Sequence, residues 1–577
     1  MEKNTVFAIL LSVVVITVGF FIQAKFFPPE DQPQQTVVQQ ETAPVREEIS
    51  PAAVSVGSGS DGLPSGIRAT DESIPVMDIQ VENNHFIATL STQRGILTSL
   101  KLKEHQEEGQ PLEMILKGSE DQGAFELFFG GPESGKIDAN FHYRRVDDYV
   151  HEFYRDFLVT DNGEEVPFTL TKRYTFKPDD YLVELQIIIE NSVKEYPALD
   201  FNGIAYTVSF GPQIGPGFKK LDGRYDFRNF YTFNDGKLNR NKSKDQVISV
   251  TDRVSWVALA GKYFTVIGIP DATPYGITFS TLPVEGLSDA HRIYFSRPLI
   301  KSSMNTDTFR FFIGPKTGKA LGMYNKTEDN GFGLQNLSLD EVIETSRMWG
   351  WLEWILKYLL LLFYKLIPNY GVAIILLTIL IKVLTYPITK KSHRSTAKMQ
   401  ELQPKINELK AKYKDTPEKM NKAMTDLYKK EGVNPMGGCL PLLLQFPIFI
   451  ALYGLLNKHF DLRGAGFIPG WITDLSSPES IWNFAPFQIP LLGWSDLRLL
   501  PILFVATQLI SSKVMQSGQP QTGQSGMQMK MMTYMMPIMF FFILYNAPSG
   551  LLLYWTVSNG LMVLQQLYTN RHRFKKA

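Results

Sequence analysis

Residues 370–387 read YGVAIILLTILIKVLTYP and are apolar on every side of a helix except at one cation, Lys382. At ~1.5 Å rise per residue, a helix of this length spans most of a bilayer core. A lysine at the centre of such a helix costs roughly 2.5–3.5 kcal/mol, so it snorkels to the headgroups, pairs, or faces a water-filled cavity. The stretch predicts a membrane-spanning helix and leaves the role of its cation open.

The composition on either side of this stretch divides the chain into two parts. With 577 residues, zero formal net charge and 44% hydrophobic residues, the chain is too long for one domain and too polar for a membrane bundle alone. Residues 71–339 have the composition of a soluble β-rich domain, whereas apolar runs recur over residues 349–567. The single cysteine, Cys439, excludes an internal disulfide.

The N-terminal region contains an uninterrupted apolar run at residues 5–22. A cleaved signal peptide is one interpretation, but the run exceeds the usual ~7–15 residues of a signal-peptide core. We therefore expect a transmembrane anchor at residues 1–27. Residues 28–75 are rich in Pro, Gln, Glu, Ser and Gly, a composition typical of a flexible linker.

Residues 76–340 contain short apolar or alternating runs, such as HFIATL at 85–90 and YLVELQIIIE at 181–190, separated by Gly, Pro, Asn and Asp. Period-two runs rich in Val, Ile, Tyr, Phe and Thr predict antiparallel strands, and their number predicts a β-sandwich. The sequence of this region shows no metal-ligand cluster, nucleophile elbow or phosphate loop. Its aromatic residues are more typical of a sandwich core than of a sugar site.

The remaining chain alternates between apolar and charged segments. Residues 346–368 set Glu353, Lys357 and Lys365 among Trp and Leu, which favours an amphipathic helix lying in the membrane interface. We expect transmembrane helices at 369–387, 437–458, 496–513, 531–547 and 549–567, a periplasmic loop at 459–495, a cytoplasmic loop at 514–530 and a basic cytoplasmic tail at 568–577.

Residues 388–436 are the most charged part of the chain. Residues 388–435 carry twelve Lys/Arg and six Asp/Glu, and apolar residues recur within them at helical spacing. This pattern predicts a helical hairpin, and its basic excess beside a membrane helix places it in the cytoplasm. A solvated charged hairpin and a docking surface for an acidic or RNA-bearing partner both remain open.

Other polar residues also fall within the apolar segments. Thr378 lies one turn before Lys382, Gln445 lies near the inner end of the next segment, and Ser558 and Asn559 lie in the last. Polar groups in lipid need partners or water, so their clustering toward the cytoplasmic half predicts a wet recess closed at the outer face. The apolar cores contain no acidic residue, which disfavours a proton- or sodium-coupled transporter.

Several motifs in this region resemble, in order and spacing, the core of the YidC-type membrane protein insertases of the YidC/Oxa/Alb family. The motifs are YPIT at 386–389, MQELQPKI at 399–406, NPMGGC at 434–439, PLLLQFP at 441–447, and PSG at 548–550 followed by Tyr554 and VSN at 557–559. The tethered β-domain resembles, in architecture, the periplasmic domain of the family's long form.

The resemblance implies a polytopic α-helical membrane protein with six spans, a five-helix insertase core and a large extracytoplasmic antiparallel β-sandwich domain. It implies a place in the bacterial inner membrane, with both termini in the cytoplasm and the large domain in the periplasm. The implied function is that of an insertase and chaperone for membrane proteins, acting alone or with the Sec translocon. It implies no catalytic residue, no metal and no cofactor. A polytopic solute transporter and a membrane-anchored envelope-binding protein are the alternatives.

The resemblance also implies two sites. A hydrophilic groove open to cytoplasm and lipid would contain Lys382, Thr378, Gln445, Trp555 and Tyr386. The groove cation of the family is commonly arginine, so Lys382 keeps the charge but loses the planar bidentate fork. The implied partners are nascent membrane proteins, the lipid bilayer, the Sec translocon and the ribosome, without DNA. The cytoplasmic docking hairpin would present Lys398, Lys405, Lys410, Lys412 and Tyr413.

Overall fold

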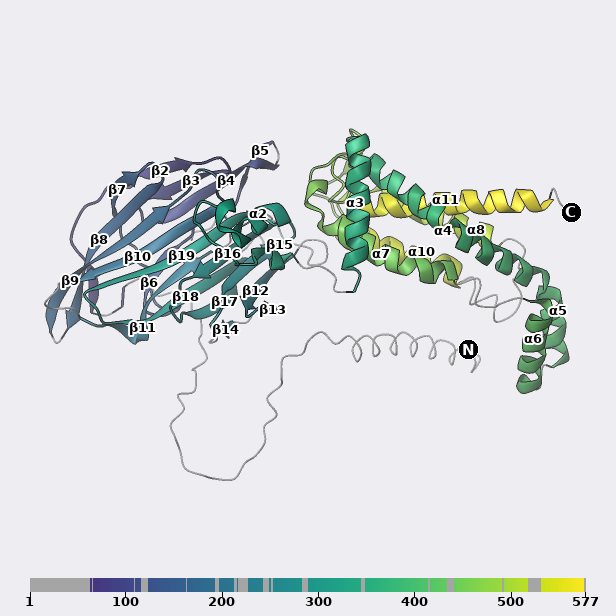
Figure 1. The fold of residues 1–577 in the computed structure, drawn as a ribbon, viewed down its shortest axis with the longest axis horizontal. Coiled ribbons are helices and arrows are strands. Elements are labelled where there is room, and N and C mark those ends of the chain that lie inside the picture. Colours follow the sequence, from purple (N-terminus) through teal and green to yellow (C-terminus); the bar gives the residue numbers. More distant parts are fainter. Residues whose placement is uncertain are drawn as a thin grey trace, which may run out of the picture.

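The structure is a computed structural model with a β-rich part and a helical part (Figure 1). It describes residues 63–574 except 65, 108, 116–122, 162, 192–196, 212–214, 216–226, 242–247, 251–252, 283–288, 344–347, 414–415, 433–439, 490–491 and 517–530. Four segments named above therefore lie outside the described residues: the expected N-terminal anchor, the linker up to residue 62, the NPMGGC motif and most of the 514–530 loop.

The β-rich part, residues 67–343, is here called the β-domain, and every strand pairing in it is antiparallel, as predicted. The ten-stranded sheet has the order β1-β8-β9-β10-β19-β16-β15-β12-β13, with β7 also on β8. Its strands are β1 Ile67–Ala69, β7 His142–Asp147, β8 Val150–Asp161, β9 Glu164–Thr175, β10 Leu182–Asn191, β12 Arg228–Asn234, β13 Lys237–Asn241, β15 Trp256–Gly261, β16 Phe264–Pro270 and β19 Met304–Pro315.

Two smaller sheets complete the β-domain. The five-stranded sheet has the order β14-β17-β18-β11-β6, and the four-stranded sheet has the order β2-β3-β4-β5. The strands of the first are β6 Glu126–Phe129, β11 Leu199–Phe210, β14 Ile248–Val250, β17 Gly276–Leu282 and β18 Ala290–Ile300; those of the second are β2 Asp78–Glu82, β3 Phe86–Ser91, β4 Ile96–Glu107 and β5 Gln110–Glu113.

Aromatic side chains join the five-stranded sheet to the ten-stranded sheet. Phe210 of β11 and Phe295 of β18 lie with their ring centroids 5.2 and 6.3 Å from that of Phe311 of β19. All three rings are buried, which is the apolar area that holds two sheets face to face. The aromatic residues of these runs thus build a core, as the sequence indicated.

The β-domain begins earlier than expected. Strand β1 falls inside the segment predicted to be a linker, and its Ile67 pairs with Val159 of β8. Ile67 is buried at 6% exposure, and Arg68 binds Glu165 with an Nη2–Oε2 distance of 2.7 Å. Three residues are too few for a visible period-two pattern, so only the free edge of β8 makes this stretch a strand.

The helical part, residues 350–574, contains seven helices that concern the site. They are α3 Gly350–Leu366, α4 Tyr370–Glu401, α7 Leu440–Lys458, α8 Leu499–Gln516, the π-helical turn η6 Met531–Met535, α10 Met536–Leu544 and α11 Ser549–Phe574. In Figure 1, α3 runs crosswise to α4 and α11. Among the described residues, 370–390 form a helix long and apolar enough to cross a membrane, and 499–513 and 533–544 form shorter apolar helices.

Helix α4 continues past the expected end at residue 387. Pro387 lies inside it, and the helix reaches Glu401, within the segment assigned to the hairpin. A proline removes one internal hydrogen bond, whereas ending the helix there would leave the last four carbonyls without partners in the helix. The proline is therefore accommodated within the helix rather than ending it.

The charged segment folds into the predicted helical hairpin of α5 Gln403–Lys412 and α6 Pro417–Glu431. Leu402 and Ile406 are buried against Met424, Leu427 and Tyr428, so the helical spacing of the apolar residues correctly indicated the contact face. Helix α6 begins with a proline in its first turn and ends at Gly432, whose φ is 63°. In Figure 1 the hairpin lies at the end of the helical part that is farther from the β-domain.

Candidate functional site

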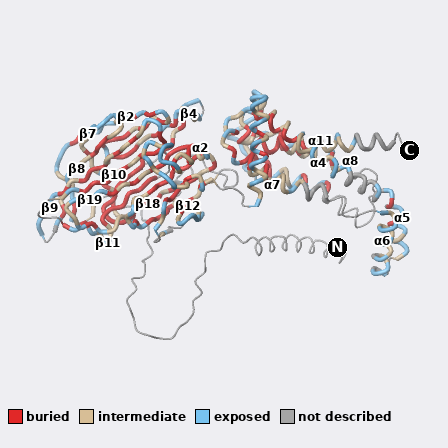
Figure 2. The backbone as a smooth tube through the Cα atoms, viewed as in Figure 1, coloured by how far each residue is buried: buried red, intermediate tan, exposed pale blue. Residues whose placement is uncertain are grey.

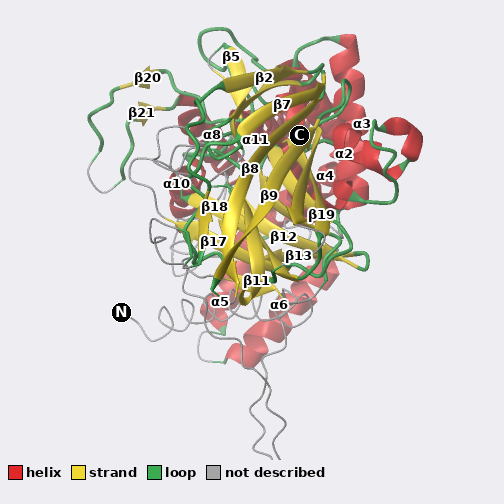
Figure 3. Cartoon of the chain, turned by 90° about the vertical axis from the view of Figure 1, so that its left-hand side faces the viewer, coloured by secondary structure: helices red, strands yellow, loops and turns green. Residues whose placement is uncertain are grey.

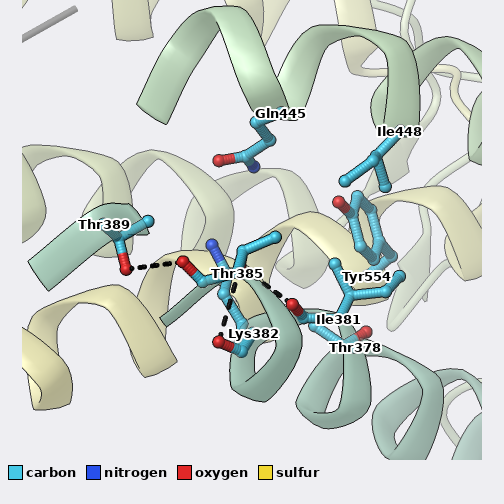
Figure 4. A pocket seen from close by; sticks show the side chains of 8 residues that line it. All are labelled: Thr378, Ile381, Lys382, Thr385, Thr389, Gln445, Ile448 and Tyr554. Atoms are coloured by element: carbon cyan, nitrogen blue, oxygen red, sulfur yellow. Dashed lines mark hydrogen bonds between the residues drawn. The ribbon is translucent and has the colours of Figure 1, made fainter. Parts of the chain in front are cut away.

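A pocket opens between α4, α7 and α11, and polar side chains make up most of its lining (Figure 4). Helix α4 contributes the face that contains Lys382, since residues three and four apart along a helix share a face. The lining residues are Thr378, Ile381, Lys382, Thr385, Thr389, Gln445, Ile448 and Tyr554.

The threonines of α4 are hydrogen-bonded within their own helix. The hydroxyl of Thr378 donates to the carbonyl of Ile374 at 2.6 Å, and that of Thr385 donates to the carbonyl of Ile381 at 2.8 Å. Each hydroxyl thereby satisfies its donor and still has an acceptor lone pair. These side chains can accept hydrogen bonds from water or a ligand without disturbing the helix.

Lys382 is the cation of the pocket. Its side chain is half-buried, and within the described part of the chain no carboxylate pairs with its ammonium. Figure 4 shows the Lys382 amine and the Gln445 amide pointing into the same space from α4 and α7. A cation that is partly removed from water and lacks a partner attracts anions more strongly than an exposed one.

The opposite wall is made by α7 and α11. Gln445 of α7 donates from Nε2 to the Ser558 hydroxyl of α11 at 3.4 Å, and Ser558 is fully buried. Tyr554, one turn before Ser558, lines the pocket. Asn559 is 4% exposed, and its Nδ2 has no hydrogen-bond partner within the described chain. A buried amide of this kind is a place for an ordered water.

The pocket is closed toward the β-domain. On that side the helices meet in a buried apolar cluster that includes Leu377 of α4, Leu455 of α7 and Leu551 of α11. The loop after α7 covers this end, because the Ser549 hydroxyl oxygen lies 2.6 Å from the carbonyl oxygens of both Asp474 and Ser477 and can donate its one proton to either. Figure 2 shows the buried residues of the helical part gathered at this end, whereas the hairpin end is mostly exposed.

Three of the five predicted groove residues, Lys382, Thr378 and Gln445, lie together in the pocket. Trp555 instead packs in an aromatic cluster, with its ring 4.5 Å from that of Phe449 and 5.2 Å from that of Phe504. Tyr386 lies on α4 beneath the Lys390 ammonium, which is 5.8 Å from its ring centroid. Neither Trp555 nor Tyr386 is among the residues that line the pocket.

Five lining residues were not predicted for the groove, and a signal existed for four of them. Ile381, Thr385 and Thr389 share the Lys382 face at helical spacing, and Tyr554 belongs to the motif quoted above. Ile448 lies three residues after Gln445 on α7. The choice between Tyr554 and its neighbour Trp555 depends on the rotation of α11, which the sequence does not reveal, because each is followed four residues later by a polar residue, Ser558 or Asn559.

Of the predicted docking residues, Lys398 lies near the end of α4, and the others lie in α5 or directly after it. Lys398, Lys405 and Lys412 are exposed, and Tyr413 is half-buried with the Lys412 ammonium 5.6 Å from its ring centroid. Lys405 pairs with Glu431 at 2.8 Å between Nζ and Oε1, which joins α5 to the end of α6. The side chain of Lys410 lies outside the described residues.

Comparison with known proteins places both parts of the chain. Residues 78–362 match the family model described as the YidC periplasmic domain, and residues 362–577 match the one described as the 60Kd inner membrane protein. The membrane protein insertase YidC of Treponema denticola is 41% identical over 99% of this chain and 99% of its own. That of Treponema pallidum is 35% identical over the same shares.

A crystal structure of an active YidC insertase is 20% identical, covers 85% of this chain and 94% of its own, and superposes with a TM-score of 0.34. The assignment therefore rests on the sequence matches, which cover both the β-domain and the helical part at nearly full length. The chain belongs to the YidC family of inner-membrane protein insertases that carry a periplasmic domain.

Proposed function

We propose that this protein inserts membrane proteins by holding the polar segment of a nascent chain in the pocket around Lys382. The observation that carries the proposal is the position of Lys382, half-buried and without a carboxylate partner in the described chain, among polar side chains from three helices. A substrate carboxylate can supply the charge that this site lacks.

The physical task is to move a hydrophilic segment across ~30 Å of hydrocarbon, where each polar group loses its hydration. A polar recess shortens the dry part of this path, and a cation within it adds an attraction that the low dielectric strengthens. The apolar cluster that closes the pocket toward the β-domain supports a recess rather than a continuous channel. Binding and positioning do the work, without covalent chemistry, a metal or a cofactor.

The proposed topology has six spans, with the β-domain in the periplasm and both termini in the cytoplasm. The basic excess of residues 388–435 and of the C-terminal tail supports this orientation. The hairpin then faces the ribosome, and its exposed lysines suit an RNA surface or an acidic protein. We also propose the Sec translocon as a partner of this protein.

The test is insertion of a single-span substrate with an acidic tail into liposomes that contain the purified protein, scored by protease protection of the tail. We expect Lys382→Leu to lower protection about tenfold, equivalent to ~1.4 kcal/mol, because the charge attraction is lost. Lys382→Arg should retain insertion, since the cation is kept. Lys390→Leu is the matched control, because Lys390 is an exposed lysine on the same helix.

Equal insertion by the parent, Lys382→Leu and Lys390→Leu would show that Lys382 only reaches for headgroups. A substrate with an uncharged tail separates charge attraction from snorkelling further. If Lys382 acts by charge attraction, Lys382→Leu should leave the insertion of this substrate unaffected. Removal of residues 71–339 tests the envelope-binding alternative, since we expect insertion to continue without the β-domain.

A further inference from the structure

The loop between α7 and α8 contains a small hairpin that the groove proposal does not use. Its strands are β20 Trp482–Asn483 and β21 Asp496–Leu497, with Trp482 paired to Leu497. We call the described residues 481–489 and 492–497 the aromatic hairpin. The sequence from 480 to 495 contains no Asp, Glu, Lys or Arg. Trp482 and Phe487 are 64% and 63% exposed, a large apolar area for a loop that would otherwise face water.

The aromatic hairpin satisfies much of its own backbone. The amide of Phe484 donates to the carbonyl of Ser495 at 2.9 Å, and that of Ile489 donates to Trp494 at 2.8 Å. At the base of the hairpin, Asp496 accepts hydrogen bonds from the Ser480 hydroxyl and the Asn483 amide. Because these polar groups are paired internally, the outward side chains can leave water at little further cost.

The base of the aromatic hairpin is fixed to the outer ends of two apolar helices. The Trp494 ring stacks on Tyr545, directly after α10, with centroids 3.5 Å apart, and the Tyr545 hydroxyl donates to the carbonyl of Asp496 at 2.5 Å. Arg498, directly before α8, donates to the carbonyl of Tyr545 at 2.7 Å. The hairpin is therefore held at a set height relative to α8 and α10.

The direction of the hairpin matters as much as its height. Figure 3 shows β20 and β21 projecting sideways beyond α8 and α10, on the side of the helical part away from α3. The exposed apolar residues continue from the hairpin onto these helices, with Phe542 of α10 at 51% and Ile502 of α8 at 42% exposure. The Phe542 ring lies 5.8 Å from that of Trp494, and in a member of an inner-membrane family such exposed apolar residues suit contact with lipid.

We propose that the aromatic hairpin enters the outer leaflet of the bilayer, with Trp482 and Phe487 at the level of the headgroups. Trp prefers this layer, Phe487 adds apolar area, and residues 481–495 carry no charge that would have to be buried, since Asp496 lies at the base of the hairpin. Helix α3 presents exposed Trp351, Trp354 and Tyr358 on the other side of the helical part. The hairpin and α3 together hold the outer ends of the helices at one depth from two sides.

The test uses the full chain in liposomes, with Cys439 replaced by serine and a single cysteine at Phe487 labelled with the environment-sensitive dye NBD. Lys237→Cys, on an exposed strand of the β-domain, is the matched control. We expect the label at residue 487 to emit at shorter wavelength, to be quenched by lipids carrying a nitroxide near the headgroup, and to be protected from aqueous iodide. The control label at residue 237 should emit at longer wavelength, should not be quenched by the nitroxide lipids, and should be quenched by iodide.

Iodide quenching at residue 487 without lipid quenching would overturn the proposal and leave the hairpin in water, available to a protein partner. The proposal rests on the membrane location of the family and not on the role of Lys382. The Lys382→Leu variant carrying the same label therefore separates the hairpin proposal from the proposed function, because its label should stay in lipid whether or not insertion is lost.

Discussion

Lys172 in the β-domain and Lys382 in the helical part are both lysines removed from water, but their surroundings differ. Lys172 is fully buried, and its ammonium donates to the carbonyls of Phe125 at 2.7 Å and Arg94 at 3.2 Å. Burial lowers the pKa of Lys172 to about 7, partly offset by Glu126. Lys382 has no carboxylate partner among the described residues and faces a pocket.

The difference shows how the two parts use polar groups. In the β-domain a buried cation is bound by the fold itself, so it stabilises one arrangement of strands and has nothing to offer a ligand. In the helical part the cation keeps its bonding capacity free, which costs stability and, in the function we propose, leaves Lys382 available to a substrate. Burial alone therefore does not separate the two lysines, whereas the unfilled hydrogen-bonding capacity of Lys382 makes it the candidate for binding.

The largest effect should come from Lys172→Met, which keeps the volume of the side chain but removes its donors. Two buried carbonyls lose their partner, and we expect the free energy of unfolding to fall by ~3 kcal/mol. Denaturant unfolding of the purified chain, followed by near-ultraviolet circular dichroism, measures the change. Lys382→Met should alter stability by less than ~1 kcal/mol, because no native contact is removed. Equal destabilisation of both variants would erase the distinction between them.

A smaller loss of folding stability should follow from lowering the pH. Burial, helped by the charge of Arg228, lowers the pKa of His291 in the β-domain to about 4. The unfolded state then binds the additional proton between about pH 6.5 and pH 4, so stability is present above this window and is lost as the pH falls through it. At pH 5 the loss from this group is ~2 kcal/mol.

His291→Gln tests that contribution, since it removes the titrating ring while keeping a polar side chain. We expect the variant to lose less stability than the parent between pH 7 and pH 5, measured by the same denaturant unfolding at each pH. His142→Gln, at an exposed histidine paired with Glu72, is the control. An unchanged pH slope in His291→Gln would assign the acid sensitivity to another group.

A smaller effect should come from a substitution in the contact between the β-domain and the helical part. Phe460, in the loop after α7, packs against His105 and Phe264 of the β-domain with ring centroids 5.1 and 5.5 Å away, and Lys262 donates to the carbonyl of Ser476 at 3.0 Å. We expect Phe460→Ala to weaken this docking by ~1–2 kcal/mol. Faster hydrogen exchange in residues 459–479 would report it, with the exchange of β10 unchanged.

Insertion by Phe460→Ala should remain near that of the parent, because the pocket lies on the other side of the apolar cluster. A loss of insertion as large as that of Lys382→Leu would mean that the β-domain and the pocket act as one unit.

The smallest effect on stability should come from Lys405→Ala in the helical hairpin of α5 and α6. Its ion pair with Glu431 is exposed, so we expect a change below ~0.5 kcal/mol. Glu431→Ala removes the same pair while keeping the lysine. If the hairpin docks an acidic or RNA-bearing partner, Lys405→Ala should weaken ribosome binding in a co-sedimentation assay more than Glu431→Ala does. Equal binding by both variants would favour a hairpin that is merely solvated.

The sequence by itself determined the elements whose signals are local. The apolar run at 370–387, interrupted only by Lys382, predicted a helix long enough to cross a membrane, and the structure has that helix. The apolar spacing in 399–428 predicted the helical hairpin, because it gives each helix one apolar face. The strand runs of the β-domain followed from period two in the same way. Lys382 could also be singled out from the sequence, because a charge within an apolar run is costly wherever it lies.

Only the tertiary structure decided which residues meet. Strand β1 exists because β8 offers it an edge, and α4 passes Pro387 because its backbone has no better partner than its own helix. Tyr554 rather than Trp555 lines the pocket because of how α11 is rotated, and Lys172 is bound because the strands place two carbonyls around it. Such contacts join residues far apart in the chain, and no local pattern records them.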